Sequence, residues 1–226
     1  MPDPAVIAEN LAAINQRIAR AARLAGRAPD AARLLAVSKG QDEAAIEASI
    51  VAGHGLFGEN RVQEAQAKWP AIKARHPQVA LHLIGPLQSN KARAALALFD
   101  AIHSLDRPKL ARELARLMAE TGRRIPLYIE VNTGGEGQKA GVAVSDLPAL
   151  IALARDELAL PVVGLMAIPP AADHPGPHFA LLAKLAARHG LEELSMGMSG
   201  DFEQAVMLGA TVVRVGTALF GARPRP

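Results

Sequence analysis

The sequence predicts an α/β fold: a single (β/α)8 barrel of the TIM type with an extra amino-terminal helix, as one domain over residues 1–226. Three observations favour this fold. Short apolar runs alternate with segments of helical periodicity along the whole chain. The runs are apolar at successive positions, which is typical of parallel strands buried on both faces. No Pro- or Gly-rich linker is long enough to separate two domains.

The first predicted helix, 3–25, comes before any strand and is therefore the extra one. Strands are then predicted at 34–37, 55–58, 80–84, 101–104, 125–131, 162–168, 194–198 and 211–215. Helices are predicted at 42–51, 61–68, 89–98, 145–157, 176–189 and 201–209, with one more on the apolar stripe Leu110, Leu114, Leu117 and Met118. A closed barrel accounts for this alternation, and an open doubly wound sheet is the alternative.

Composition excludes several classes of partner. Lys and Arg exceed Asp and Glu by 25 − 22 = 3, and with five Phe, one Trp and one Tyr the chain has few platforms for stacking bases, so nucleic acid is not expected. No run of eighteen residues lacks a charge, and Asp3 and Glu9 stand where a signal peptide would be basic, so no membrane contact is expected. The absence of cysteine fits a cytoplasmic protein and excludes a thiolate metal site.

The apolar strand at 34–37 leads through Ser38 directly into Lys39. In α/β proteins the carboxyl ends of the strands are where ligands bind. An amine there, backed by hydrocarbon, is partly desolvated, and this favours the free base that attacks a carbonyl carbon. Lys39 is thus a candidate Schiff-base lysine. The alternative is an ordinary strand-end lysine that reaches for solvent.

A candidate phosphate site follows the last two strands. Ser199 with Gly200, and Gly216 with Thr217, offer hydroxyl groups and backbone N–H groups that an anion can approach closely. Asp201 and Glu203 nearby would repel a phosphate if they pointed inward. The alternative is that these residues only cap a helix and form a turn. A phosphate clamp opposite a lysine suits a phosphorylated aldehyde held as an imine.

Other motifs carry weaker functional signals. The segment 135–140 matches a dinucleotide-binding fingerprint, but it follows the fifth strand and Gly141 stands where a helix should start. His174 and His178 have the spacing of a metal pair, yet prolines lie between them, which favours a surface loop.

Three further side chains have two interpretations each. His82 and His103, which alternate with apolar residues on strands, are interpreted as core or barrel-lining residues, with a functional role as the alternative. Lys139, in a loop at the predicted mouth, is either a secondary site for the aldehyde or a solvated lysine.

The sequence resembles the pyridoxal phosphate homeostasis protein family, barrels related to the amino-terminal domain of alanine racemases. The matching segments are Ala36-Val37-Ser38-Lys39, Phe57-Gly58-Glu59-Asn60-Arg61-Val62-Gln63-Glu64, His82-Leu83-Ile84-Gly85-Pro86-Leu87-Gln88-Ser89-Asn90-Lys91, Val131-Asn132-Thr133, Gly164-Leu165-Met166, Leu194-Ser195-Met196-Gly197-Met198-Ser199 and Val213-Arg214-Val215-Gly216-Thr217.

The resemblance implies pyridoxal 5′-phosphate (PLP) as cofactor, bound to Lys39 as an aldimine. It implies that Ser199, Gly216 and Thr217 hold the phosphate and that Arg214 faces the pyridine nitrogen. Asn60 and Met166, in matched segments, are predicted to contact the cofactor as well.

The resemblance further implies PLP homeostasis and delivery rather than catalysis, so no catalytic residue is assigned. An arginine beside the ring nitrogen leaves that nitrogen unprotonated, which weakens the ring as an electron sink. A racemase also needs a second acid/base, which the resemblance places on a tyrosine of a further domain that is expected to be absent here. Tyr128 lies in an apolar strand and is expected in the core. A racemase-like PLP enzyme is the alternative, and the predicted partners are apo PLP-dependent enzymes, with the protein itself a monomer.

Overall fold

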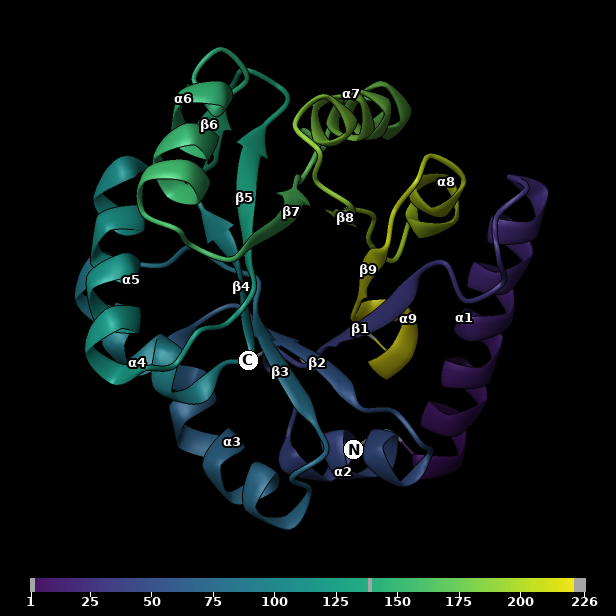
Figure 1. Ribbon diagram of the computed structural model, residues 1–226. Coiled ribbons are helices and arrows are strands. Elements are labelled where there is room, and N and C mark those ends of the chain that lie inside the picture. The colour runs from purple at the N-terminus through teal and green to yellow at the C-terminus, as the bar shows by residue number, and fades with distance from the viewer. Residues whose placement is uncertain (1–2, 138–139, 222–226) are drawn as a thin grey trace.

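The computed structural model describes residues 3–137 and 140–221, and in them parallel strands close into a barrel surrounded by helices (Figure 1). The strands are β1 (Arg33–Val37), β2 (Leu56–Glu59), β3 (Ala80–Leu83), β4 (Ala101–Leu105), β5 (Leu127–Asn132), β7 (Val162–Met166), β8 (Glu193–Ser195) and β9 (Val212–Val215). They are ordered β4-β3-β2-β1-β9-β8-β7-β5, and pairing of β4 with β5 closes the ring. The predicted (β/α)8 barrel is confirmed, and the open-sheet alternative is wrong.

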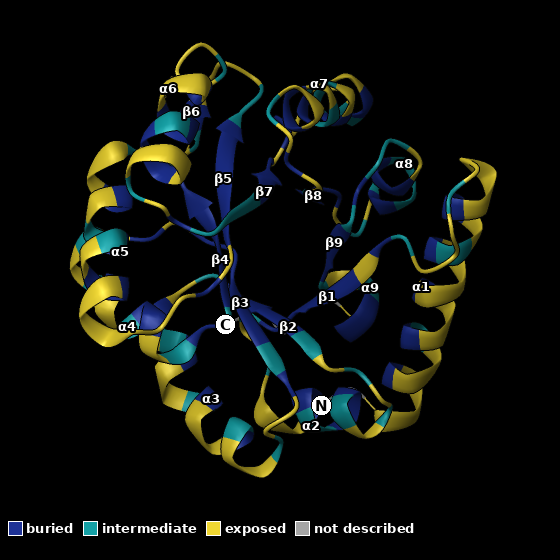
Figure 2. Cartoon of the chain, in the orientation of Figure 1, coloured by how far each residue is buried: buried dark blue, intermediate teal, exposed yellow. Residues whose placement is uncertain are grey.

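The helices cover the outside of the barrel, and their apolar faces pack on the strands while their polar faces meet solvent (Figure 2). They are α2 (Glu43–Val51), α3 (Val62–Arg75), α4 (Ala92–Leu98), α5 (Pro108–Thr121), α6 (Leu147–Ile151), α7 (Pro175–Arg188), α8 (Phe202–Met207) and α9 (Thr217–Phe220), with a 3₁₀ turn η1 (Ser89–Lys91) before α4. Strand residues that point outward join this core, whereas several that point inward are polar, namely His82, His103, Ser195 and Arg214.

The extra amino-terminal helix, α1 (Pro4–Leu24), is confirmed. Asp3 caps it, with the Ala5 N–H donating to Asp3 Oδ1 over 2.9 Å. Its buried stripe of Ile7, Leu11, Ile14 and Ile18 packs beside α2, α8 and α9. The helix therefore covers the region where the first and last strands of the barrel meet.

Several boundaries differ from those predicted. Helix α3 continues to Arg75 through Pro70, because Trp69 and Ile72 extend its buried stripe and packing outweighs the proline. The predicted helix 145–157 is α6 followed by a π-helical segment, η2 (Ala152–Glu157). Strand β8 ends at Ser195, since the chain turns at Gly197, whose φ is +90°. The short strand β6 (Val142–Ala143), paired with β5 outside the barrel, and α9 were not predicted.

One of the two histidines with the spacing of a metal pair has an ordinary structural role. His178 lies in α7 and not in a surface loop, and its ring contacts Thr133 Oγ1 (3.1 Å) and Asp173 Oδ2 (3.2 Å). The described residues contain no group of three potential metal ligands. None of the helices described is both long and apolar enough to cross a bilayer.

Candidate functional site

A cavity of about 340 Å³ opens at the carboxyl ends of the strands, which is large enough for a small-molecule ligand. It is lined by Lys39, Asn60, Ser199, Arg214, Gly216 and Thr217, together with Val37, Gln41, Ile84, Ile168, Met198, Gly200 and Gly221. Six of the seven residues predicted to contact the cofactor therefore share one cavity. Met166 is the seventh. It is buried among Ala101 and Tyr128 deeper in the barrel and is not part of this wall, so its predicted contact with the cofactor stays a prediction.

Lys39 follows β1 in a turn held by a buried ion pair. Glu59, fully buried at the end of β2, accepts hydrogen bonds at Oε1 from Ser38 Oγ (2.7 Å) and Trp69 Nε1 (3.1 Å), and Lys68 Nζ lies 2.7 Å from the same oxygen. Lys68 also donates to the carbonyl of Ser38 over 2.9 Å. These contacts fix the backbone on the amino-terminal side of Lys39.

The turn after Lys39 is fixed as well. Gly40 adopts a φ of +69°, a conformation that glycine tolerates best, and its N–H donates to Glu64 Oε1 over 2.6 Å. Lys68 Nζ also donates to the carbonyl of Gln41 over 3.3 Å. Both sides of Lys39 are therefore anchored, which positions its amine at the cavity.

The two predicted phosphate segments meet at the cavity beside β1, the strand that leads into Lys39. The Ala218 N–H at the start of α9 points to Ser199 Oγ at 3.4 Å, which links the loop after β8 to the segment after β9. Gly216 lies so close to β1 that an added Cβ would stand 3.2 Å from the carbonyl oxygen of Val37. Hydroxyl groups and a helix start at a glycine suit an anion such as phosphate.

The acidic residues that could oppose a phosphate are engaged elsewhere. Asp201 Oδ1 accepts the Met198 N–H over 2.5 Å, and Glu203 pairs with Arg17 of α1 at 2.6 Å. Neither residue lines the cavity. The repulsion that these carboxylates would exert on a phosphate is therefore weaker than it would be if they pointed into the cavity.

Arg214 is the cation at the base of the cavity, and its side chain is anchored from below. Nη1 donates to Ser195 Oγ (2.7 Å) and Nη2 donates to the carbonyl of Ala167 (2.9 Å). Burial lowers the pKa of Arg214 to about 10, against the opposing influence of Glu130 and Asp201. Arg214 therefore stays charged at neutral pH while its direction is fixed.

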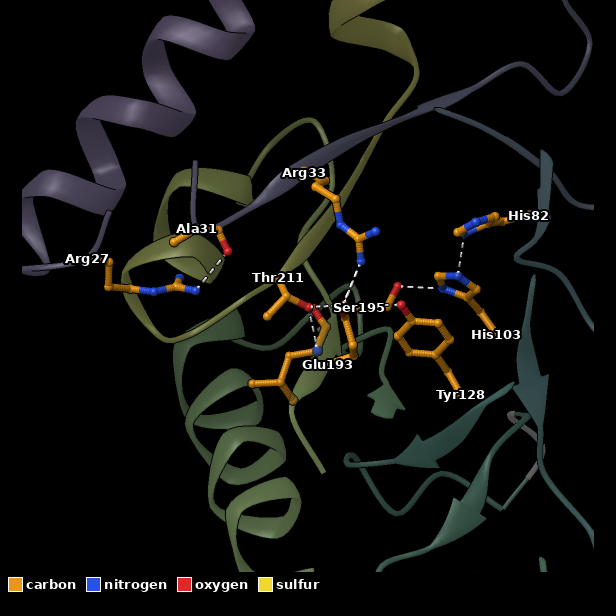
Figure 3. Close-up of polar contacts among 10 residues, drawn as sticks. Arg27, Ala31, Arg33, His82, His103, Tyr128, Glu193, Ser195 and Thr211 are labelled. Atoms are coloured by element: carbon orange, nitrogen blue, oxygen red, sulfur yellow. Dashed lines mark hydrogen bonds and ion pairs between the residues drawn. The ribbon is translucent and has the colours of Figure 1, made fainter. Parts of the chain in front are cut away.

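Below Arg214, a chain of hydrogen bonds runs through the barrel interior. Figure 3 shows its part from Ser195 through His103 to His82. Ser195 Oγ lies 2.8 Å from His103 Nδ1, and His103 Nε2 lies 3.0 Å from His82 Nδ1. Because Arg214 can only donate, the single proton of Ser195 finds a partner only if it points to His103 Nδ1. His103 then carries its proton on Nε2 and donates to His82. All the bonds in the chain therefore run in one direction, away from Arg214.

Both histidines in this chain are neutral. Burial lowers the pKa of His82 to about 4, and burial followed by the charges nearby lowers the pKa of His103 well below its usual value. The sequence interpretation of both as barrel-lining residues is confirmed. Arg214 is thus supported by neutral groups, which leave its positive charge for the cavity.

Tyr128 lies in the amino-terminal half of the barrel, as expected of a core residue. Its ring stacks on His103 with centroids 4.0 Å apart, and its hydroxyl reaches Glu193 over 3.3 Å (Figure 3). Burial raises the pKa of Tyr128, so the phenol keeps its proton. It does not line the cavity that contains Lys39.

Some functional candidates were missed in the sequence or cannot be placed. Glu59, Lys68 and Ser195 support the site. Their spacing in the sequence did not predict this role, because their partners lie on other strands and helices. Glu130 was also missed. A carboxylate near the carboxyl end of a predicted barrel strand is a signal that could have identified it. Lys139 lies outside the described residues.

Comparisons with known proteins place the chain in a family. The family model described as "Alanine racemase, N-terminal domain" matches residues 10–224. A pyridoxal phosphate homeostasis protein of Pseudomonas aeruginosa is 45% identical over 222 residues, covering 96% of each chain. The protein of that name from Escherichia coli K12 is 37% identical over 231 residues, covering 96% of this chain and 97% of the relative. The chain belongs to the pyridoxal phosphate homeostasis protein family.

Solved structures agree with this family. PipY of Synechococcus elongatus without PLP has a TM-score of 0.84 at 41% identity, and covers 95% of this chain and 100% of its own. The PipY structure with PLP bound has a TM-score of 0.78 at 40% identity, with the same coverage. Alanine racemase of Corynebacterium glutamicum, at 22% identity and a TM-score of 0.71, shares the fold over 99% of this chain but only 62% of its own. Members of the pyridoxal phosphate homeostasis protein family are named for homeostasis rather than for a reaction.

Proposed function

We propose that this protein binds PLP through Lys39 and acts in PLP homeostasis and delivery without catalytic turnover of its own. The observation that carries the proposal is one cavity lined by an amine, a segment suited to an anion and a buried arginine. These groups match the aldehyde, the phosphate and the ring nitrogen of PLP. The PLP-bound PipY relative supports the same assignment.

Each residue has a distinct part in this proposal. PLP supplies an aldehyde that combines reversibly with amines. Lys39 Nζ bonds covalently to the aldehyde carbon, and Ser199, Gly216 and Thr217 hold the phosphate. Arg214 donates to the ring nitrogen, and Asn60 and Met166 complete the contacts.

The way in which Arg214 is held affects whether the protein can catalyse a reaction on the cofactor. Because Arg214 keeps its own protons, the ring nitrogen stays unprotonated and withdraws electrons weakly. Tyr128, the only tyrosine of the sequence, is held away from the cavity. A carrier is therefore favoured over a racemase-like enzyme. The proposal includes residues 1–226 as a single PLP-binding domain, a monomeric protein in the cytoplasm, and apo PLP-dependent enzymes as recipients.

Absorption spectra and chemical trapping test this proposal. The purified protein mixed with PLP should be yellow, and borohydride should fix the cofactor on Lys39, as peptide mass analysis would show. Lys39→Ala should abolish the band. A colourless protein, or a cofactor fixed on another lysine while Lys39→Ala keeps the colour, would refute the assignment of Lys39.

A further inference from the structure

A second chamber, of about 220 Å³, adjoins the cavity that contains Lys39. The two share Asn60, Ile84 and Ile168 as walls, so a molecule in the chamber lies next to the proposed PLP site. The chamber is otherwise lined by Gly85, Pro86, Ala140 and the end of β5, where Glu130 is located. Nothing in the proposed binding of PLP by Lys39, the phosphate segments and Arg214 uses this space.

Glu130 is the charged residue of this chamber, and its side chain has no fixed partner. Only 7% of the residue is exposed, yet it makes no hydrogen bond or ion pair with any residue that the structure describes. Burial, and then the charge of Asp106, raises the pKa of Glu130 to about 7, while Arg214 opposes this shift. A buried carboxyl without partners is costly to folding, so its presence calls for a ligand or a chemical role.

Asn60 gives an independent sign of a missing donor. Its Oδ1 atom is buried and accepts no hydrogen bond from the described residues, although the side chain borders both the chamber and the cavity. Glu130 and Asn60 therefore both line this chamber, and each carries an oxygen that has no donor among the described residues. A primary ammonium group supplies both the positive charge and the N–H donors that these oxygens lack.

We propose that this chamber binds the amine that takes PLP from Lys39, and that Glu130 accepts a proton from its ammonium group. The inference rests on the proposed function and names the chemical class of the acceptor, a primary amine on a small molecule or on a lysine of a recipient protein. Only the deprotonated amine is a nucleophile, so a carboxylate in the chamber that adjoins the cavity of Lys39 removes the barrier that the ammonium form presents.

The exchange is balanced without any further reactant. The ammonium group gives one proton to Glu130, and its nitrogen then forms a double bond to the aldehyde carbon in place of the double bond from that carbon to Lys39 Nζ, while one proton passes from the incoming nitrogen to Lys39 Nζ. Lys39 leaves as an amine and takes up a proton from solvent, and Glu130 returns its proton to solvent. No electrons are gained or lost. A carboxyl group that ionises near neutral pH can serve in both directions.

Two amines of different basicity test this role on the PLP-loaded full chain. Ethylamine is a cation at pH 7.5 and needs to lose a proton, whereas methoxyamine is already neutral. The loss of the Lys39-bound absorption band gives the rate for each. Glu130→Gln should slow the reaction with ethylamine by about 10- to 100-fold and leave the rate with methoxyamine within about twofold. Glu130→Asp keeps the carboxylate on a shorter side chain, so its rate with ethylamine should lie between those of wild type and Glu130→Gln.

Controls separate this inference from the function on which it rests. Glu136→Gln, an exposed carboxylate in the loop after the same strand, should change neither rate. The same comparison in a Lys139→Met background excludes the predicted aldehyde site on Lys139 as the origin of the effect. Equal rates for wild type and Glu130→Gln with ethylamine would overturn the inference while PLP binding stands. Absence of any band, or of reaction with methoxyamine, would instead count against PLP binding by Lys39.

Discussion

The mouth and the base of the cavity support their basic side chains in different ways. At the carboxyl-terminal mouth, Lys39 is anchored by a turn whose charges, Glu59 and Lys68, lie outside the cavity and neutralise each other. At the base of the same cavity, Arg214 donates to Ser195, which in turn contacts neutral His103. The mouth thus presents an amine on a rigid turn, and the base of the cavity presents a cation of fixed direction. The difference indicates a site built to hold a ring in one orientation while its covalent bond exchanges.

Removing the buried cation under Lys39 should have the largest effect on stability. Lys68→Met leaves Glu59, which is fully buried, without its counter-charge and removes the donors to Ser38 and Gln41. We expect the free energy of unfolding to fall by about 3–5 kcal/mol, as for other broken buried pairs. Urea unfolding measures this change.

A surface pair provides the matched control. Arg116 on α5 pairs with Glu113 and Glu120, and all three side chains are well exposed or partly exposed. Arg116→Met should cost less than about 1 kcal/mol. Similar losses for the two variants would show that the pair of Glu59 and Lys68 does not anchor the turn.

The neutral state of His82 predicts a pH dependence of stability. Its pKa falls from 6.5 in the unfolded chain to about 4 in the fold, so the unfolded chain binds more protons between these values. The stability due to neutral His82 is complete above pH 6.5 and is lost as the pH falls toward 4. Between pH 7 and pH 5 this amounts to about 2 kcal/mol.

The comparison of His82→Gln with wild type isolates this contribution. Glu130, whose pKa is raised to about 7, changes stability in the opposite direction over the same interval, so the profile of the wild type alone is flattened. Unfolding curves at several pH values should show that His82→Gln becomes more stable relative to wild type as the pH falls. Parallel profiles would mean that the pKa of His82 is the same in the fold as in the unfolded chain.

Ser195 tests how Arg214 is positioned. Ser195→Ala removes the acceptor of Arg214 Nη1 and should weaken PLP binding by about 1–3 kcal/mol. Ser104→Ala is the control, because Ser104 is also buried but its Oγ has no partner among the described residues. Binding titrations should show no loss for Ser104→Ala.

An analogue of PLP with carbon in place of the ring nitrogen distinguishes positioning from general damage. If Ser195 acts through Arg214 on the ring nitrogen, Ser195→Ala should bind this deaza analogue as well as wild type does. An equal loss for PLP and the analogue would assign Ser195 a purely structural role.

The phosphate segments should give the smallest effects. Ser199→Ala and Thr217→Ala should each weaken PLP by about 1–3 kcal/mol, toward the lower end where backbone N–H groups share the phosphate. Binding of pyridoxal, which lacks the phosphate, should change less. Losses of the same size for PLP and pyridoxal would refute a phosphate contact at these residues.

The barrel and the mouth could be predicted from the sequence because both follow from the order of the chain. Strand-length apolar runs place Lys39, Ser199 and Thr217 after strands, and parallel strands bring their carboxyl ends together.

The supports could not be predicted in this way. His103 and Ser195 are separated by 92 residues, and their contact depends on inward-facing positions of separate strands. Helix α3 was predicted too short for a related reason. The burial of Trp69 and Ile72, which outweighs Pro70, depends on tertiary packing.

The most direct test of a carrier without turnover is the exchange of an amino acid α-proton. The PLP-loaded protein is incubated with L-alanine in deuterium oxide, and the α-proton signal is followed by NMR. If Arg214 keeps the ring nitrogen unprotonated and no second acid/base faces the substrate, exchange should be no faster than with free PLP. Rapid exchange that Lys39→Ala abolishes would contradict this account and favour a racemase-like enzyme.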